Sequence, residues 1–179
     1  LTVRDAIGGL PPVKAGDSPS EDGFHRSARH RASTIEVIRA VPPNGGSRPA
    51  GIGPKCLDRV DGYYDVYGRL AWDKPSITIT HYARNPASGR FVHPVQDRGL
   101  TMREAARLQG FPDTFLIDGT FDDTFRQIGE AVPPPLATGV ASAVRDAFQG
   151  EVDDGEEELI VAPVNNSYAG VIAGIKARR

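Results

Sequence analysis

The sequence predicts a loop-rich α+β fold built from short helices and short strands. Gly contributes 20 and Pro 15 of the 179 residues, about a fifth of the chain, and this favours turns and loops. Some segments show the spacing of apolar side chains that is typical of helices. Others alternate apolar and polar residues as strands do. The two patterns occur in one chain and therefore favour a mixed fold.

The charges divide the chain into a basic middle and an acidic end. Residues 24–90 contain eleven Lys and Arg against five Asp and Glu, whereas residues 151–179 contain three and six, within a net charge of -2. A basic, loop-rich stretch suits a polyanion such as nucleic acid. It equally suits a solvated charged surface, and the composition leaves both readings open.

The composition also excludes some protein classes. No stretch approaches the roughly 18 consecutive apolar residues of a membrane-spanning helix, and no secretory signal is seen at the front. The single cysteine, Cys56, excludes an internal disulfide and fits a reducing compartment. Because the first residue is Leu1 and not Met, we expect a fragment or a processed piece of a longer protein.

Two short helices are predicted before the basic loop. Residues 3–10 form the first helix, which ends in glycines and prolines. The second begins at Ser33 or Thr34, either of which can cap it, and ends at Pro42. Residues 43–62 lack periodicity and are rich in Gly and Pro, so we expect a long loop there.

A β-hairpin is predicted in the middle of the chain. Residues 76–82 (SITITHY) alternate β-branched and polar side chains, and residues 89–94 (GRFVHP) resemble a partner strand, with turn residues between them. Arg84, Ser88 and Arg90 would then lie at the tip, where arginine can contact guanine or hold phosphate. A solvated turn is the alternative.

The clearest helical signal follows, in the segment LTMREAARLQGFPD. Thr101 and Glu104 form a capping box, in which each side chain bonds the backbone amide of the other residue, and Gly110 ends the helix. Another short helix is predicted to start at Thr120. Two aspartates follow it, in the first turn, where the helix dipole favours acidic residues.

The stretch RQIGEAVPPPLATGV, residues 126–140, places a lone acid before three prolines. We expect the backbone to break at residues 129–132 and a helix to run from Pro134 to about Phe148, since proline is tolerated in a first turn. Residues 151–158 are strongly acidic and are predicted to form a linker.

Three blocks together resemble, in order, the C-terminal third of bacterial DNA (cytosine-5)-methyltransferases. They read YGRLAWDKPSITIT, SGRFVHPVQDRGLTMREAARLQGFPDTF and RQIGEAVPPPLA. Several blocks in the right order and spacing are far more specific than one motif. The resemblance covers roughly residues 1–148.

The resemblance implies a domain layout. Residues 1–112 would form a small target-recognition domain, residues 113–150 would return to the catalytic domain, and residues 151–179 would be a linker and tail of unassigned role. The helix from Pro134 would pack on a large Rossmann-like methyltransferase domain that this chain lacks, so its apolar face is expected to be exposed. Double-stranded DNA would lie between the two domains.

The resemblance also implies the chemistry. In the family, a thiolate adds to C6 of a flipped cytosine, and C5 takes the methyl group of S-adenosylmethionine. The family cysteine follows a proline in a Pro-Cys-Gln loop, whereas Cys56 follows Lys55, so no catalytic residue is assigned in this chain. An N-terminal catalytic domain or subunit is the implied partner and carries the main cofactor pocket. The chain is not expected to be active alone.

Four positions acquire roles through the resemblance. Thr78 and Ile79 match a Thr–aliphatic pair that supports the DNA-facing loops, although an ordinary strand pair is the alternative. Glu130 and Ala131 lie in the block that helps to close the cofactor pocket. The family usually has Asn at the first of these, whereas an ionised Glu only accepts hydrogen bonds. Such a carboxylate would attract the cofactor ammonium but repel the cofactor carboxylate. Altered cofactor binding is therefore expected.

The remaining charged residues have structural explanations. One set is predicted to form an ion-pair network that holds the recognition region: Arg98, Arg103, Glu104 and Arg107. The spacing of another set fits no common zinc pattern, so no metal site is expected: His25, His30, Cys56, His81 and His93. Two other functions stay open, namely a catalytically silent DNA-binding or regulatory remnant and a structural module that does not bind DNA.

Overall fold

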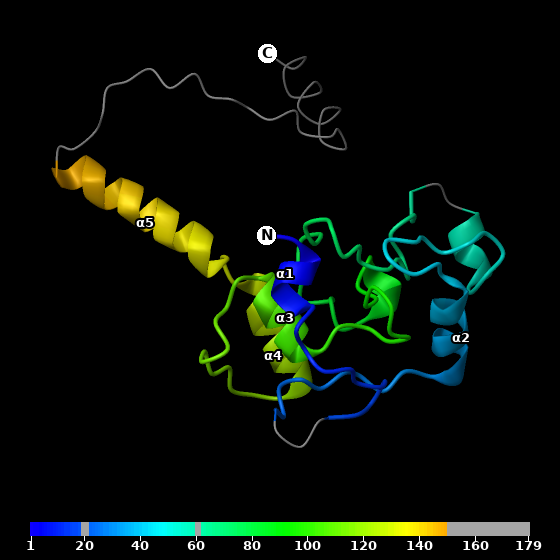
Figure 1. Ribbon diagram of the computed structural model, residues 1–179. Coiled ribbons are helices and arrows are strands. Elements are labelled where there is room, and N and C mark those ends of the chain that lie inside the picture. The colour runs from blue at the N-terminus through cyan, green and yellow to red at the C-terminus, as the bar shows by residue number, and fades with distance from the viewer. Residues whose placement is uncertain (19–21, 60–61, 150–179) are drawn as a thin grey trace, which may run out of the picture. The chain divides into compact units, whose positions relative to one another are not determined.

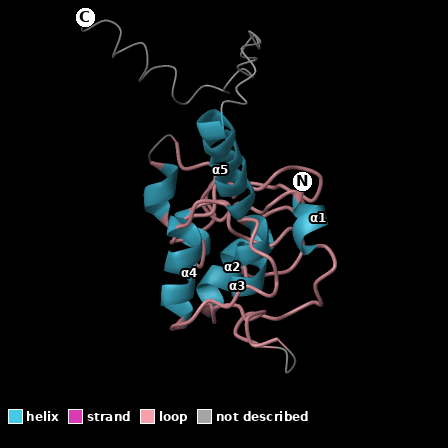
Figure 2. Cartoon of the chain, turned by 90° about the vertical axis from the view of Figure 1, so that its left-hand side faces the viewer, coloured by secondary structure: helices cyan, strands magenta, loops and turns pink. Residues whose placement is uncertain are grey.

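The computed structural model describes residues 1–18, 22–59 and 62–149. Within these ranges the regular structure is helical and no strand is formed (Figures 1 and 2). The helices follow in chain order as α1 (Val3–Ile7), α2 (Ala32–Ala40), η1 (Lys55–Asp58), η2 (Pro86–Ser88), α3 (Met102–Leu108), α4 (Phe121–Glu130) and α5 (Pro134–Gln149), of which the two η elements are 3-10 helices.

The chain divides into two compact units, Leu1–Ala141 and Ser142–Arg179. The described part of the second unit is the end of α5, residues 142–149. The predicted acidic linker and tail, residues 151–179, lie outside the described residues. No described helix is both long enough and apolar enough to span a bilayer.

The main core of the first unit lies between α1, α3 and α4. Ile7, Leu100, Ala105, Phe125 and Ile128 are all buried in this cluster, and α3 contacts both α1 and α4. Burying a large aliphatic or aromatic side chain contributes about 1.5–3 kcal/mol. These contacts hold the end of α3 beside α4, which is where the cavity described below is formed.

A second cluster covers α2. Val37, Ile38 and Val41 pack against Val66 and Val92. Leu57 of η1 is partly buried against the same cluster. The long predicted loop is therefore attached to α2 by apolar side chains, without regular secondary structure of more than one turn.

Capping boxes start three of the helices. The predicted Thr101–Glu104 box is present. Helix α4 starts after Thr120 as predicted, and Thr120 and Asp123 form a box that was not predicted, as do Thr2 and Asp5 at the start of α1. The cap predicted at Ser33 or Thr34 is wrong. The N-cap of α2 is Arg31, two residues before Ser33, and its side chain makes no capping hydrogen bond.

The predicted β-hairpin is not formed. Residues 77–81 cross α4 at Gly129, where an added Cβ would lie only 2.1 Å from the His81 nitrogen. Their alternation is satisfied by packing, because Ile79 enters the main core. The turn region folds on itself as η2, where the Asn85 side chain accepts from the Ala87 amide.

The second half of that hairpin pairs with other segments. Residues 91–93 exchange backbone hydrogen bonds with residues 68–70 on one side and with residues 98–100 on the other. These contacts amount to isolated bridges, Arg69 to Val92 and Val92 to Gly99. The sequence pattern therefore identified an extended segment but assigned it the wrong partner.

The predicted backbone break at residues 129–132 is also partly wrong. Helix α4 continues through Gly129 and ends at Glu130, and only the following residues are extended. Glycine is needed here because the crossing backbone leaves no space for a side chain. It does not end the helix.

Candidate functional site

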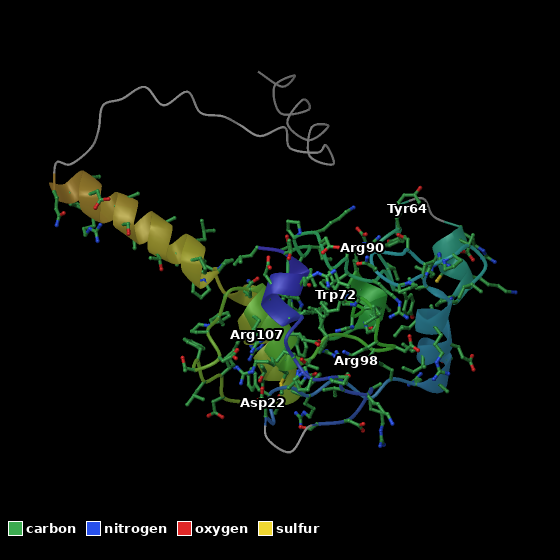
Figure 3. The ribbon with its side chains drawn as sticks, in the orientation of Figure 1. Asp22, Tyr64, Trp72, Arg90, Arg98 and Arg107 are labelled. Atoms are coloured by element: carbon green, nitrogen blue, oxygen red, sulfur yellow. The ribbon has the colours of Figure 1, made fainter. Side chains whose placement is uncertain are left out.

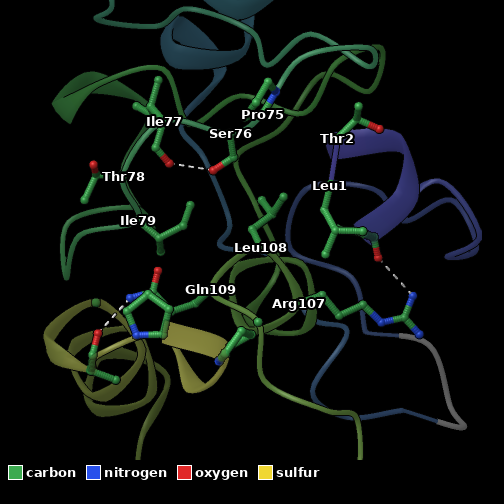
Figure 4. Close-up of a pocket in the computed structure, with 16 residues that line it drawn as sticks. Leu1, Thr2, Pro75, Ser76, Ile77, Thr78, Ile79, Arg107, Leu108 and Gln109 are labelled. Carbon is green, nitrogen blue, oxygen red and sulfur yellow. Dashed lines mark hydrogen bonds between the residues drawn. The ribbon is translucent and has the colours of Figure 1, made fainter. Parts of the chain in front are cut away.

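A cavity of about 520 Å³ lies where α3, the end of α4 and residues 75–79 meet. Figure 4 shows that its walls come from segments far apart in the chain. Thr78, Ile79 and Ala131 all line it. The structure therefore brings together two predicted DNA-contacting residues and one predicted cofactor-contacting residue.

The end of α3 fixes one wall of this cavity. The Gln109 side-chain amide donates to the Ala131 carbonyl over 2.9 Å (Figure 4). Gly110 has a φ of 90°, and a Cβ there would lie 2.9 Å from the Pro135 Cδ. Both residues hold the junction between α4 and α5 against α3. Sequence reasoning assigned Gln109 no role, although it lies in the block that carried the resemblance.

Of the Thr78–Ile79 pair, Thr78 is exposed at the surface and Ile79 is buried in the core. Ile79 is 2% exposed and belongs to the main core. Thr78 is exposed, and its hydroxyl has no hydrogen-bond partner in the described part of the chain. The pair can therefore anchor this segment while presenting one free hydroxyl.

The two predicted cofactor residues do not make a complete cofactor site. Glu130 is exposed, and its carboxylate is unpaired within the ranges that the structure describes. The Ala131 carbonyl already accepts from Gln109. S-adenosylmethionine has a carboxylate that Glu130 would repel, and an adenosine that needs an enclosing apolar surface. We therefore derive no catalytic step through the cofactor from these residues.

The three residues predicted at the hairpin tip are tied to the protein itself. Arg84 pairs with Asp122 over 3.2 Å, and the Ser88 hydroxyl donates to the Tyr82 carbonyl over 2.7 Å. Arg90 pairs with Asp65 over 2.8 Å. None of the three lines the cavity.

Arg90 is the most constrained of these residues. Its side chain is 18% exposed. Beyond Asp65, its guanidinium donates to the Gly45, Gly46 and Arg69 carbonyls and to the Ser47 hydroxyl. This bonding joins the loop after α2 to residues 65–69 and leaves little of the group free to meet DNA (Figure 3).

The predicted ion-pair network is present in two parts. Arg98 and Glu104 form a bidentate pair with two 2.7 Å contacts, and each side chain is 1% exposed. Arg103 pairs with Asp22 and, over 3.6 Å, with Asp113, which also pairs with Arg107. Both parts connect α3 to neighbouring loops; Figure 3 labels Asp22, Arg98 and Arg107.

A buried arginine that the sequence did not single out supports the same region. Arg69 is 3% exposed. It donates to the Ile38 and Val41 carbonyls at the end of α2, and to the His93 carbonyl. Its ion pair with Asp97 measures 2.6 Å. Nothing in its sequence neighbourhood distinguishes it from a solvated arginine.

His93 and His30 serve as hydrogen-bond acceptors inside the unit. Burial lowers the pKa of His93 to about 4, the charges of Arg98 and Arg69 act in the same direction, and Glu104 opposes them. The ring accepts from the Val95 and Gln96 amides. Burial, followed by the charge of Arg98, also lowers the pKa of His30.

No cluster of three or more His, Cys, Asp or Glu residues suited to a metal ion occurs in the described part of the chain. Cys56 is exposed on η1, which belongs with α2 and not with the cavity. The one thiol of the chain therefore does not meet the residues that gather at the cavity.

Comparison with known proteins gives this geometry a context. A family model for C-5 cytosine-specific DNA methylase matches residues 21–146. The chain is 36% identical over 157 residues to the type II methylase M.HgiDII of Herpetosiphon aurantiacus, covering 83% of this chain and 44% of that protein. It is 42% identical over 154 residues to the type II methyltransferase M.AgeI of Thalassovita gelatinovora, covering 83% and 34%.

The likeness extends to solved structures. A protein encoded within an E. coli prophage and assigned as a DNA modification methyltransferase superposes with a TM-score of 0.57, at 22% identity over 83% of this chain and 47% of that one. This likeness concerns the fold. The chain spans less than half the length of each of these three proteins.

Proposed function

The chain belongs to the C-5 cytosine-specific DNA methylase family, and on that premise we propose that it is the target-recognition and C-terminal part of a DNA (cytosine-5)-methyltransferase. The whole enzyme would transfer a methyl group from S-adenosylmethionine to C5 of cytosine at a specific duplex site. This chain would bind the duplex and recognise its target site. The thiol chemistry would come from a catalytic portion outside these 179 residues.

The observation that carries the proposal is the family match over residues 21–146 in a chain that spans 44% of a relative. The lone thiol supports it. Cys56 is exposed on η1, away from the residues that line the cavity. A nucleophile must lie within reach of the flipped base, so a thiol from another portion fits better than Cys56.

In the proposed layout, residues 1–112 read the duplex and residues 113–150 return to a Rossmann-like catalytic domain. Leu136 and Val140 on α5 are 58% and 56% exposed. Their exposure was expected from the resemblance and is explained if the catalytic domain covers them. Thr78, Arg84, Ser88 and the residues around them remain predicted DNA contacts.

The cofactor would supply the methyl group from a pocket held mainly by the catalytic portion. This chain would contribute the junction after α4, which Gln109 and Gly110 hold in place. Glu130 stands near that junction, where the family usually has Asn. A carboxylate there weakens attraction for the cofactor carboxylate.

Duplex binding tests this proposal. Fluorescence anisotropy with a labelled duplex should show binding by the chain that weakens as salt is raised from 50 to 200 mM, because phosphate contacts release counterions. Adding a polypeptide that carries the family's Pro-Cys-Gln loop should tighten the complex. Absence of binding at the lowest salt, with and without that polypeptide, would contradict the proposal.

One observation favours a second candidate, a catalytically silent DNA-binding remnant. Glu130 replaces the amide that the family usually has, and its carboxylate is exposed. A remnant should bind duplex tightly alone and gain nothing from a catalytic portion. A mobility-shift assay with and without that portion separates the two candidates.

A further inference from the structure

We propose that Arg26, Arg29 and Arg31 form an edge that binds the phosphate backbone of duplex DNA. This inference rests on the proposed function and names a surface that the sequence did not single out for it. The sequence placed its DNA-contacting arginines at residues 84 and 90. The structure gives those two arginines internal carboxylate partners, Asp122 and Asp65.

The segment that carries the edge is fixed by its inward-facing residues. Ser27 is 3% exposed and forms an antiparallel bridge with Thr101. The His30 ring accepts from the Gly99 amide over 3.0 Å. Both contacts attach the segment to the residues that lead into α3, so its backbone is held at two points.

One arginine of the edge lies between these anchors and the other two flank them directly. Arg26, Arg29 and Arg31 are exposed, whereas Ser27 is buried and His30 is half-buried. In Figure 1 this blue segment runs from the region of α3 and α4 toward α2. Three guanidinium groups therefore follow one another along a fixed backbone.

Backbone and ring contacts restrict two of the three arginines without neutralising them. The Arg26 guanidinium lies 5.3 Å from the centroid of the Phe121 ring, a contact that leaves its charge and most of its donors available. The Arg29 backbone packs beside Gly16, where an added Cβ would lie 3.2 Å from the Arg29 Cβ. A fixed arginine loses less conformational entropy when it binds phosphate.

The charges on this edge are not satisfied within the protein. None of the three arginines has an ion pair or a side-chain hydrogen bond in the described ranges. The nearby carboxylate of Asp22 is occupied by Arg103, with a 2.9 Å contact. Asp17 lies beside the segment, because its backbone carbonyl accepts from the Ser27 amide. Three unpaired guanidinium groups near this one carboxylate still leave an excess of positive charge, which fits the regularly spaced phosphates of a duplex.

The test is duplex binding by the full 179-residue chain as a function of salt. The variant Arg26→Gln/Arg29→Gln/Arg31→Gln removes the edge. The matched control Lys55→Gln/Arg59→Gln/Lys74→Gln removes the same charge from exposed residues elsewhere. Loss of three phosphate contacts should reduce the slope of log K against log salt by about 2–3. Circular dichroism checks that both variants stay folded.

The expected result is a shallower slope and at least tenfold weaker binding at 50 mM salt for the arginine variant, with little change for the control. Equal losses of duplex affinity in the two variants would mean that net charge alone attracts DNA. This result would contradict the proposed binding edge. Unchanged binding in the arginine variant would overturn it too, while leaving the proposed function intact. No binding by the unmodified chain, both alone and with the catalytic polypeptide, would contradict the proposed function itself.

Discussion

Arg98 is the largest side chain that the first unit buries completely, and its pairing with Glu104 decides whether that burial is tolerable. Removing an ion from water costs several kcal/mol unless a partner and further hydrogen bonds replace the solvent. The Val13 and Gly99 carbonyls and the Gln96 side chain accept further hydrogen bonds from Arg98. The Glu104 carboxylate also accepts from the Thr101 amide.

We predict that Glu104→Gln destabilises the chain by about 3–5 kcal/mol, because it leaves the buried Arg98 charge without its counter-ion. The control Asp113→Asn weakens the pairs with Arg107 and Arg103, where half of the aspartate side chain is exposed, and should cost at most about 1 kcal/mol. Urea unfolding measures both. A similar small loss in the two variants would show that the buried pair is not a support of the fold.

Stability should fall as the pH is lowered from about 6.5 to about 4. The folded chain holds the pKa of His93 at about 4, below its usual 6.5, so the unfolded chain binds more protons in this window. The loss is on the order of 3 kcal/mol. Arg98 holds the pKa of Glu104 below its usual value against the effect of burial, which adds a loss in the same direction at lower pH.

The variant His93→Gln isolates this effect. Its free energy of unfolding should be lower than that of the unmodified chain at pH 8 but should change less between pH 7.5 and 4.5. Some slope should persist, since burial also lowers the pKa of His30. Identical pH profiles for the two proteins would show that His93 does not control acid stability.

At the scale of elements, sequence patterns predicted helix starts correctly where the stabilising side chains are close together in the sequence. The Thr101 and Thr120 caps depend on side chains three residues apart, and both were predictable. The hairpin prediction was wrong because both segments have partners that lie far away in the sequence. Residues 77–81 pack on α4, and residues 91–93 bridge to two other segments, which no short pattern reveals.

The crossing of residues 77–81 over α4 makes Gly129 a sensitive position. Gly129→Ala should destabilise the chain by about 1–3 kcal/mol, because the new Cβ would overlap the backbone of Thr80 and His81. The matched change Gly139→Ala in α5 meets no atom within 4 Å. It should be neutral or stabilise by up to about 1 kcal/mol. Thermal unfolding compares them, and equal effects would contradict the close crossing.

At the scale of the whole molecule, the sequence predicted the family but not the arrangement of the site. The resemblance identified the segments that meet at the cavity. It could not show that Gln109 and Gly110 hold the α4–α5 junction. It also could not show that the Arg90 guanidinium donates hydrogen bonds to backbone carbonyls. Those facts depend on which segments lie next to one another in three dimensions.

The apolar face of α5 tests whether a catalytic portion outside these 179 residues covers this helix. Leu136, Val140, Val144 and Phe148 recur at a spacing of four residues, which places them on one side of a helix. Leu136→Gln/Val140→Gln should change the stability of this chain by no more than about 0.5 kcal/mol, since both residues are exposed. It should, however, weaken association with a catalytic portion.

The control for that association is Thr138→Gln, an exposed position on the side of the same helix away from Leu136 and Val140. Affinity for the catalytic portion, measured by calorimetry, should drop at least tenfold for the double variant and stay within twofold for the control. Equal affinities would mean that this face of α5 is not the contact.

The most direct measurement is transfer of labelled methyl from S-adenosylmethionine to duplex DNA. It compares this chain alone, a polypeptide with the family's Pro-Cys-Gln loop alone, and the two mixed. The account predicts incorporation only in the mixture, undiminished when Cys56 is replaced by Ser. Methyl incorporation by this chain alone would contradict the claim that this chain recognises the duplex while another portion carries the thiol. Loss of incorporation by the mixture when Cys56 is replaced by Ser would contradict it too. Background incorporation in every pairing would contradict the split between two portions.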